Sequence, residues 1–330
     1  MRIEISNTKQ FNKLLFSKYK LKLKNTIKGV SIDSRLVKCG DIFIPLSGQK
    51  FDGHQFIENA IDLGASLILS EKKPKINSKK IVYVDSTYDS LINIAKEWRK
   101  KFNGNIIGIT GSNGKTTTKE ILASILSNNV KCNYTKGNYN STTGVPLSII
   151  GMDTDADAYI FELGMSKPGE IKSLCDISNP KIGLITNISG AHIKNFKSLT
   201  NIALEKSSLF LSLSNNDIAF YNIDDPFIFN IKSDAKKISY SLNKKADYYG
   251  KMIFNKNATV NLLINDKINI HLPYRTKSFA YNALAAFSIA DYLNINKNDI
   301  INSIEKFENL SGRGKIYNYD NNIVIDDTYN

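Results

Sequence analysis

Residues 105–120, NIIGITGSNGKTTTKE, combine residue types that bind phosphate. An apolar, β-branched segment leads into two glycines, and a Lys-Thr-Thr-Thr sequence then begins a helix. Glycine lets backbone N–H groups approach phosphate oxygens, and the start of a helix adds the positive end of its dipole. In such a loop the lysine reaches the β- and γ-phosphates and the next threonine reaches Mg²⁺. The segment therefore predicts a site for ATP or GTP, formed by Thr110, Gly111, Ser112, Asn113, Gly114, Lys115, Thr116 and Thr117.

This loop departs from the strict Walker pattern G-x-x-x-x-G-K-[ST]. The position five before Gly114 is Ile109, so the match is to a shorter T-G-x-x-G-K-T form. An ordinary glycine-rich turn is the alternative, but strand, loop and helix follow here in the order that the motif requires. We therefore keep the phosphate-binding interpretation.

Two more candidates follow predicted strands, where open α/β sheets bind their ligands. Glu162 comes directly after the apolar residues 159–161 and could hold Mg²⁺, or it could be a solvated charge at a strand end. His192 lies in the loop after residues 182–187, where its imidazole could serve a second metal or a substrate. A single loop histidine is more often a surface residue.

Polar side chains also interrupt the apolar stripes of two predicted helices. Lys206 falls on the stripe of a helix at about 198–213. Its amine either extends to the surface or is desolvated, loses its proton and becomes chemically available. Asn282 falls on the stripe of a helix at about 278–293, and a buried amide needs a partner. That partner could be a base or ribose, or an internal hydrogen bond.

Three loops have compositions suited to polar ligands. Residues 135–146, TKGNYNSTTGVP, could grip such a ligand or merely connect two elements. Residues 32–35 (IDSR) and 51–54 (FDGH) bracket a strand and could recognise a phosphate-bearing ligand, with an arginine as the anion partner. The candidate substrate-binding residues are Ser34, Arg35, Asp52, His54, Asn138 and Asn140.

The elements that must position these residues predict an α/β fold. Apolar strands alternate with helices, which indicates a mainly parallel, helix-covered sheet with strands at 106–110, 158–163, 182–187 and 218–222. Residues 259–264 and 268–272 flank an Asn-Asp turn and predict a small antiparallel element. We expect a small N-terminal α/β domain at 1–80, a central ATP-binding domain at 81–311, and the start of a further domain at 312–330.

The composition of the chain disfavours several kinds of partner and site. The net charge of +13 comes mostly from lysines spread along the chain, whereas base readout uses clustered arginines and aromatic residues, so we expect no nucleic-acid partner. The three cysteines lack C-x-x-C spacing, which disfavours a zinc site or a disulfide framework. No apolar segment approaches the ~18 residues of a membrane span, so we expect a cytoplasmic monomer without membrane insertion.

Taken together, these motifs resemble those of the Mur ligases, ATP-dependent amide-bond-forming enzymes of bacterial peptidoglycan precursor synthesis. That family has the short T-G-x-x-G-K-T loop. The similar segments extend from residue 32 to residue 330 and are TGSNGKTTTKE, GNYNSTTGVPLS, FELGMSKPGEI, AHIKNF, ALEKSSLF, YNALAA and IDDTYN. Within the family they are most similar to the member that joins D-alanyl-D-alanine to UDP-N-acetylmuramoyl-tripeptide.

The resemblance implies a metal site with two Mg²⁺ ions. Thr116 and Glu162 would hold one ion. His192 and a carbamylated Lys206 would serve the second, since a deprotonated lysine reacts with CO₂ and becomes an anionic ligand. The implied catalytic residues are Lys115, Glu162, His192 and Lys206.

The resemblance also implies where the substrates bind. Asn282, Arg313 and Asp327 would contact the base, phosphate and ribose of ATP, in that order. The N-terminal domain would hold the UDP part of the acceptor through residues 33–35 and 52–54. The implied reaction is phosphoryl transfer from ATP to the terminal carboxylate of the tripeptide, followed by attack of the D-alanyl-D-alanine amine on the acyl phosphate.

Members of this family carry a third, C-terminal domain, and this sequence stops at Asn330 inside the segment that leads into it. If the 330 residues are the whole molecule, we expect weak or absent ligation, because domain closure supplies ligand contacts and excludes water. The alternatives are another Mur-type or folylpolyglutamate-type amide ligase, or a non-catalytic fragment that binds nucleotide or the UDP-linked precursor.

Overall fold

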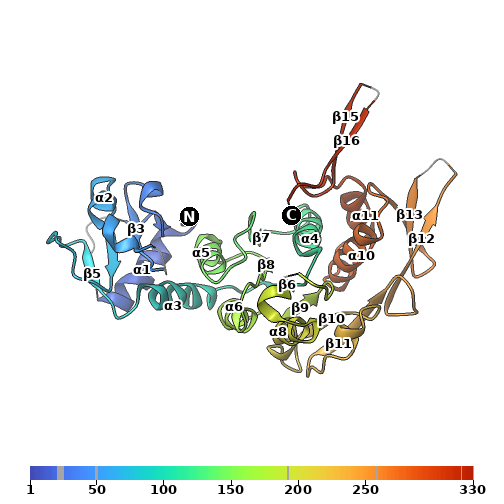
Figure 1. The fold of residues 1–330 in the computed structure, drawn as a ribbon, viewed down its shortest axis with the longest axis horizontal. Coiled ribbons are helices and arrows are strands. Elements are labelled where there is room, and N and C mark those ends of the chain that lie inside the picture. The colour runs from blue at the N-terminus through green and yellow to red at the C-terminus, as the bar shows by residue number, and fades with distance from the viewer. Residues whose placement is uncertain (21–25, 49–50, 192, 257–258, 321, 330) are drawn as a thin grey trace. The chain divides into compact units, whose positions relative to one another are not determined.

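The computed structural model describes residues 1–20, 26–48, 51–191, 193–256, 259–320 and 322–329 (Figure 1). It contains two compact units. Unit 1 consists of Met1–Gly104, Asn133–Asp157 and Ser173–Asn179, and unit 2 of Asn105–Cys132, Ala158–Lys172 and Pro180–Asn330. Both have α/β architecture, which confirms the predicted fold class.

Unit 1 is built on a small, mostly parallel sheet. Its strands lie in the order β1 (Arg2–Glu4), β2 (Gly29–Ser31), β3 (Asp41–Phe43), β4 (Leu67–Ser70) and β5 (Ile81–Tyr83), and only the pairing of β1 with β2 is antiparallel among these described strands. Because β5 pairs with β4, this sheet continues past residue 80. The domain boundary between residues 80 and 81 remains a prediction from the sequence.

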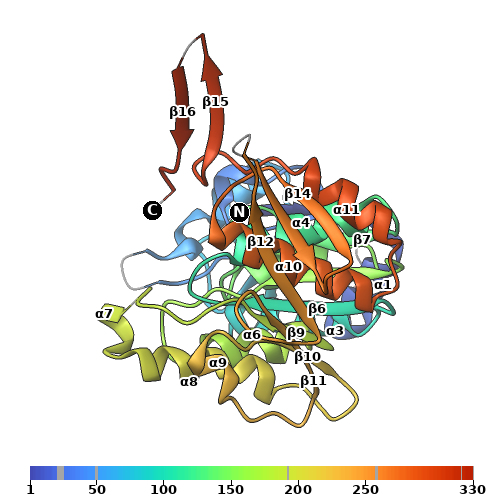
Figure 2. The ribbon, with the colours of Figure 1, turned by 90° about the vertical axis from the view of Figure 1, so that its right-hand side faces the viewer.

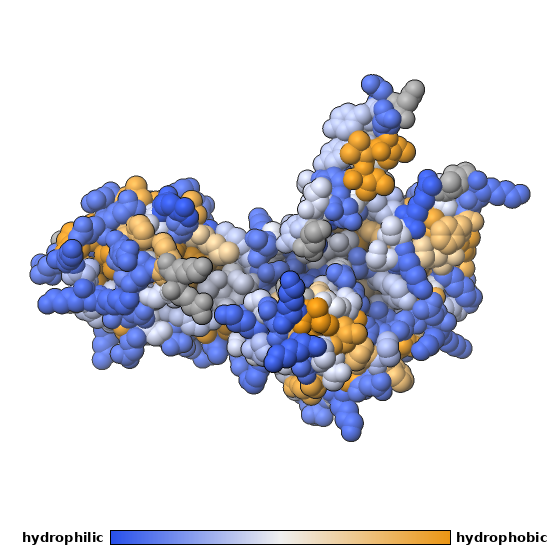
Figure 3. Space-filling view, in the orientation of Figure 1, coloured by the Kyte–Doolittle hydropathy of each residue, from blue (hydrophilic) through white to orange (hydrophobic). Residues whose placement is uncertain are grey.

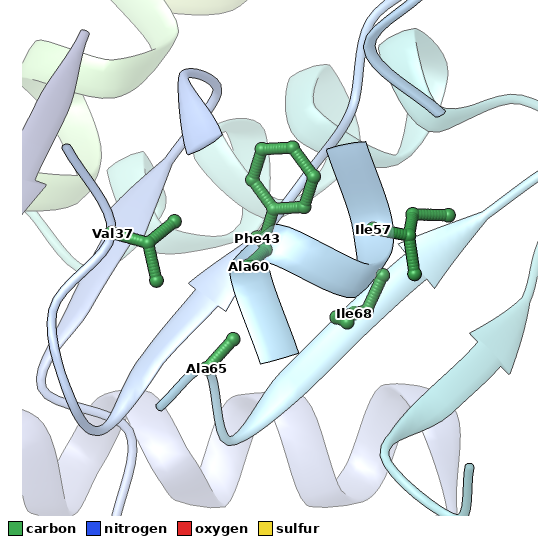
Figure 4. Close-up of a cluster of buried hydrophobic side chains, with 6 residues drawn as sticks. All are labelled: Val37, Phe43, Ile57, Ala60, Ala65 and Ile68. Carbon is green, nitrogen blue, oxygen red and sulfur yellow. The ribbon is translucent and has the colours of Figure 1, made fainter. Parts of the chain in front are cut away.

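The helical segments of unit 1 supply its core. They are α1 (Thr8–Tyr19), α2 (Ile57–Asp62), α3 (Thr87–Arg99), α5 (Gly144–Gly151) and the 3-10 turns η1 (Ser34–Leu36) and η2 (Gly53–Phe56). Figure 4 shows one buried apolar cluster between α2 and the sheet, formed by Val37, Phe43, Ile57, Ala60, Ala65 and Ile68. The N-terminus of α3 is capped, since the Ser86 side chain accepts a hydrogen bond from the Asp89 backbone N–H.

Unit 2 contains the mainly parallel sheet that the sequence predicts. Its strands lie in the order β14 (Ile268–Leu272), β13 (Val260–Ile264), β12 (Tyr248–Phe254), β11 (Lys236–Ser241), β10 (Ile218–Asn222), β9 (Ile182–Ile185), β6 (Asn105–Thr110) and β8 (Ala158–Glu162). From β12 to β8 neighbouring strands are parallel, and β12 to β14 form the antiparallel element. Strand β7 (Cys132–Tyr134) spans the division between the units.

Helices cover both faces of this sheet (Figures 1 and 2). On one face α4 (Lys115–Ser127) packs against α10 (Lys277–Tyr292) and α11 (Lys297–Glu305), and on the other α8 (Leu199–Leu211) packs against β6 and β9. Unit 2 also contains α7 (Ile193–Phe196) and α9 (Pro226–Phe229), and α6 (Glu170–Ser178) spans the division between the units. Strands β6, β8, β9 and β10 are buried along almost their whole length, which explains their continuous apolar sequences.

Two hairpins complete unit 2. Strands β13 and β14 pair antiparallel, with Ile264 opposite Ile268, so the predicted hairpin is confirmed. Of the three residues between them, Asn265 and Asp266 have positive φ, of 50° and 54°. A second hairpin pairs β15 (Lys315–Tyr319), which the sequence analysis did not predict, with β16 (Asn322–Asp326). Apolar side chains are visible on it in Figure 3, and Ile323 is 70% exposed. None of the described helices is long and apolar enough to cross a bilayer.

An ion pair that joins two strands of unit 1 gives a stability prediction. Arg2 donates two hydrogen bonds, of 2.7 and 2.9 Å, to the fully buried Asp41 on β3. Arg2→Met leaves that carboxylate buried without its guanidinium, so we expect the free energy of unfolding to fall by about 3 kcal/mol in urea titrations. Arg35→Met is the control, because Arg35 is 84% exposed. Equal losses from both variants would contradict this assignment.

Candidate nucleotide and metal site

The phosphate loop of residues 111–114 joins β6 to α4 and needs both of its glycines. Gly111 and Gly114 have φ values of 150° and 79°. A Cβ atom on Gly111 would collide with the Thr186 hydroxyl, and one on Gly114 with the Asn282 amide oxygen. Backbone conformation and lack of space therefore both select glycine at these positions.

The segment that follows β9 holds this loop in place. Thr186 Oγ1 and Asn187 Nδ2 donate to the Asn113 carbonyl oxygen, over 2.6 and 2.9 Å, and the Asn113 N–H donates to Asn187 Oδ1. Ser112 Oγ donates to the Ser189 carbonyl oxygen over 2.9 Å. The sequence analysis missed these contacts, although a polar stretch directly after a buried strand was a usable signal. These protein contacts hold the loop in a defined shape, as a preorganised site requires.

Two lysine side chains converge on one carbonyl oxygen of this loop. Lys115 Nζ donates to the Gly111 oxygen over 2.8 Å, and Lys206 Nζ, from α8, donates to the same atom over 2.9 Å. Lys206 is only 2% exposed, so its side chain does not extend to the surface. Burial, together with the charge of Lys115, lowers the pKa of Lys206 to about 7. The structure thus shows that Lys206 is buried, and the loss of its proton stays a prediction.

Burial also lowers the pKa of Lys115, and the charge of Arg313 acts in the same direction. Glu162 opposes this shift. The charges of Arg313 and Glu162 therefore both change the pKa of Lys115, in opposite directions. An anion placed against Lys115 would meet a strongly positive, poorly solvated environment.

Glu162, at the end of β8, is 2% exposed and therefore not a solvated strand-end charge. It accepts a hydrogen bond of 3.1 Å from Thr116 Oγ1, and Lys119 Nζ lies 3.7 Å from its second oxygen. Lys119 is fully buried and also pairs with Glu120 over 2.9 Å. The sequence analysis missed Lys119, which lies one helical turn after Thr116 on α4.

The hydroxyl of Thr116 and the carboxylate of Glu162 are hard oxygen donors of the kind that Mg²⁺ prefers. Among the described residues no group of three or more His, Cys, Asp or Glu could hold a metal ion. Mg²⁺ is commonly bound through one or two protein oxygens together with substrate phosphates. His192, the predicted contributor to a second metal, lies outside the described residues.

The predicted nucleotide contacts on α10 and near the chain end differ in their surroundings. Asn282 is buried, and its Oδ1 accepts a hydrogen bond from Thr118 Oγ1 over 3.2 Å, so it has an internal partner. The Arg313 guanidinium stacks on the Tyr329 ring at 3.7 Å. Asp327 is exposed. Its roles and those of Asn282 and Arg313 toward ATP stay predictions.

In unit 1 the side chain of Arg35 is open to an anion. Its Nε and Nη2 donate to Asp33 over 2.9 and 2.8 Å, and this pairing lowers the pKa of Asp33 to about 2. The arginine is nevertheless 84% exposed, while Ser34 beside it is buried. Asn138 is exposed and Asn140 is half-buried.

Asp52 and His54 are largely occupied by their own loop. Asp52 pairs with Lys72 over 2.6 Å, which holds the pKa of the carboxyl well below its usual range. His54 is buried, with Nδ1 2.7 Å from Asp52 and Nε2 3.5 Å from the Glu71 backbone nitrogen. Since both ring nitrogens face protein groups, His54 shapes this loop, and direct contact with a ligand stays a prediction.

Comparison with known proteins identifies the family. Residues 26–107 match the family model described as "Mur ligase family, catalytic domain", and residues 109–290 match "Mur ligase middle domain". The chain belongs to the Mur ligase family. The sequence motifs therefore predicted the family correctly.

Individual Mur ligases are similar over most of the chain. The UDP-N-acetylmuramoyl-tripeptide--D-alanyl-D-alanine ligase of Rickettsia prowazekii is 37% identical over 314 residues, which cover 91% of this chain and 69% of that protein. The crystal structure of MurF from Acinetobacter baumannii has a TM-score of 0.88 at 27% identity, covering 96% and 72% of the two chains. MurF ligase from Thermotoga maritima, solved with ADP, has a TM-score of 0.82 at 29% identity, covering 91% and 71%.

The buried pair in this Mur ligase gives a second stability prediction. Lys119→Met removes the cation beside Glu162 and leaves the carboxylate in a poorly solvated place. We expect the free energy of unfolding to fall by roughly 3 kcal/mol or more in urea titrations. Lys251→Met, which removes an exposed ion pair with Asp266, should cost much less. A loss from Lys119→Met no larger than that of the control would refute the assignment.

The lowered pKa of Lys206 predicts a pH dependence. Its folded pKa of about 7 lies below the ordinary 10.5, so between these values the unfolded chain holds this proton more tightly and folding is favoured as pH rises. The unfolding free energy of wild type, relative to Lys206→Met, should rise between about pH 7 and pH 10, with a slope that approaches about 1.4 kcal/mol per pH unit by pH 8 to 9. Urea titrations at pH 7, 8 and 9 measure this. A difference that does not change with pH would rule the shift out.

Proposed function

We propose that this chain binds ATP through residues 111–116 and serves the ATP-dependent joining of D-alanyl-D-alanine to UDP-N-acetylmuramoyl-tripeptide. The observation that carries the proposal is the convergence of Lys115 and Lys206 on the Gly111 oxygen, beside the buried pair of Thr116 and Glu162. Support for the reaction comes from the Rickettsia prowazekii relative, whose name states it. The cytoplasmic location and the monomeric state expected from the sequence belong to this proposal.

The residues of the phosphate loop have defined tasks in such a reaction. Backbone N–H groups at the start of α4 bind phosphate oxygens, and Lys115 turns from the Gly111 oxygen toward the transferring phosphoryl group, whose charge it neutralises. Thr116 and Glu162 would hold Mg²⁺, which supplies Lewis-acid stabilisation of that charge when bound. The tripeptide carboxylate then becomes an acyl phosphate, and the amine of D-alanyl-D-alanine displaces phosphate from it. No side-chain nucleophile is needed.

Lys206 has a separate task in this proposal. Because its pKa is lowered to about 7, more of its amine is neutral near that pH than in an ordinary lysine. The neutral nitrogen can attack CO₂, lose a proton and become an anionic carbamate. That carbamate, with His192, would serve a second Mg²⁺. Lys206 would then change from a donor to the Gly111 oxygen into a metal ligand.

Substrate contacts complete the proposal. Arg35 offers an exposed guanidinium to the phosphates of the UDP group. Ser34, Asp52 and His54 would belong to the same substrate site. Asn138 and Asn140 would contact the acceptor. On unit 2, Asn282, Arg313 and Asp327 would contact the base, phosphate and ribose of ATP.

Two measurements test this function separately. ADP binding, followed by calorimetry, should weaken about 10- to 100-fold in Lys115→Met, because a charge-assisted hydrogen bond to phosphate is lost. Lys306→Met removes an exposed lysine of the same unit and should leave binding unchanged. ADP binding that is insensitive to Lys115→Met would contradict the phosphate site.

The second measurement is ADP release from ATP with UDP-N-acetylmuramoyl-tripeptide, with and without D-alanyl-D-alanine. Release that requires both compounds supports this ligase reaction. Release with a different amino acid or with a folate acceptor favours another amide ligase. Tight ADP binding without turnover supports a non-catalytic binding fragment instead.

A further inference from the structure

Glu205, which the sequence analysis did not single out, is a buried acid on α8. It is 9% exposed, and both carboxylate oxygens are used: Oε2 accepts from the Gly169 N–H and Oε1 from the Ile171 N–H, each over 2.8 Å. A buried carboxylate is costly unless it is compensated, and here two backbone donors at the start of α6 compensate it. Glu205 therefore ties α8 to the segment that connects β8 with α6.

That connecting segment, residues 163–169, begins immediately after Glu162. Its own conformation is fixed independently of Glu205, because the Glu170 carboxylate accepts from the Ser166 N–H, and Asn195 Nδ2 donates to the Ser166 oxygen over 2.8 Å. A change in the position of Glu205 at the far end of this segment would therefore also move Glu162, at the end of β8.

The residue after Glu205 is Lys206, which reaches the Gly111 oxygen. The contacts thus form a closed ring. Glu162 meets Thr116 on α4, the phosphate loop meets Lys206 on α8, and Glu205 returns from α8 to the segment after Glu162. Packing of α8 against β6 and β9 places the helix on the sheet, and Glu205 adds a polar link from α8 to the segment after Glu162.

We propose that Glu205 is a positioning residue that sets the separation between Glu162 and Lys206, and thereby the affinity of the site for metal-bound nucleotide. The inference rests on the proposed function, because it takes both groups to act at one metal and phosphate site. Displacement of supporting groups by about 1 Å is enough to weaken such sites, and loss of residues that orient ligands commonly costs 10- to 100-fold in metal affinity. Glu205 itself touches no substrate.

The test compares ADP binding to the full chain in excess Mg²⁺ and in EDTA. Glu205→Gln keeps the side-chain size, but its NH₂ group faces one of the two backbone donors. We expect its Kd for ADP to rise about tenfold with Mg²⁺ and to change less than twofold in EDTA. Glu205→Asp keeps the charge but shortens the link by one methylene, so it should also raise the Kd with Mg²⁺. It carries the test if the glutamine variant does not fold.

Glu305→Gln is the matched control, since Glu305 also accepts a backbone N–H, that of His271, over 2.8 Å on unit 2. It should bind ADP like wild type in both conditions. Wild-type affinity in both Glu205 variants would overturn the inference, as would equal weakening with and without Mg²⁺, which indicates a merely structural role. Wild-type affinity in Glu205→Asp alone would show that charge, not position, matters. If Mg²⁺ does not affect ADP binding to wild type, the proposed metal site itself fails.

Discussion

The sharing of the Gly111 oxygen by two buried amino groups is the interaction on which the site depends. Lys115 and Lys206 both donate to it, and their proximity, together with burial, leaves positive charge poorly solvated. One carbonyl oxygen cannot neutralise two ammonium groups, so the folded chain responds by lowering the pKa of Lys206 and by favouring an anion beside Lys115. A polyphosphate supplies such an anion, and the loop offers it backbone donors as well.

The rest of unit 2 keeps these groups in place. Gly111 and Gly114 bring the loop backbone against Thr186 and Asn282, leaving no room for a side chain. The parallel strands deliver Glu162 to the same edge of the sheet as the loop, because the carboxyl ends of β6 and β8 lie side by side. Preorganisation of this kind means that binding energy is not spent on ordering the site.

Local sequence patterns predicted the parts of the site that depend on local structure. Strand β10 was predicted with the bounds observed, because an uninterrupted apolar segment is typical of a buried strand. The position of Lys206 on an apolar stripe left burial and extension to the surface open, and the structure shows burial. Lys119 and Glu205 could not be found in this way. Their partners Glu162 and Gly169 lie on other elements, so only the folded chain shows why a charge is buried there.

Asp52 and His54 of unit 1 show that polar patterns do not separate structural from ligand-binding roles. Asp52 and His54 resemble ligand-binding residues in sequence, yet in the fold the carboxylate pairs with Lys72 and the imidazole contacts its own loop.

In unit 2, strand β15 was missed because its sequence, KIYNY, has too few apolar residues to distinguish it from a loop. Polar patterns leave both structural and functional roles open, whereas apolar patterns constrain the fold.

A crystal structure of the chain with ADP and Mg²⁺ tests the central claim most directly. The account predicts that the diphosphate lies against the backbone of residues 111–116, with Lys115 Nζ moved from the Gly111 oxygen onto the β-phosphate. ADP bound elsewhere on the chain, or bound here with Lys115 still on the Gly111 oxygen, would contradict it.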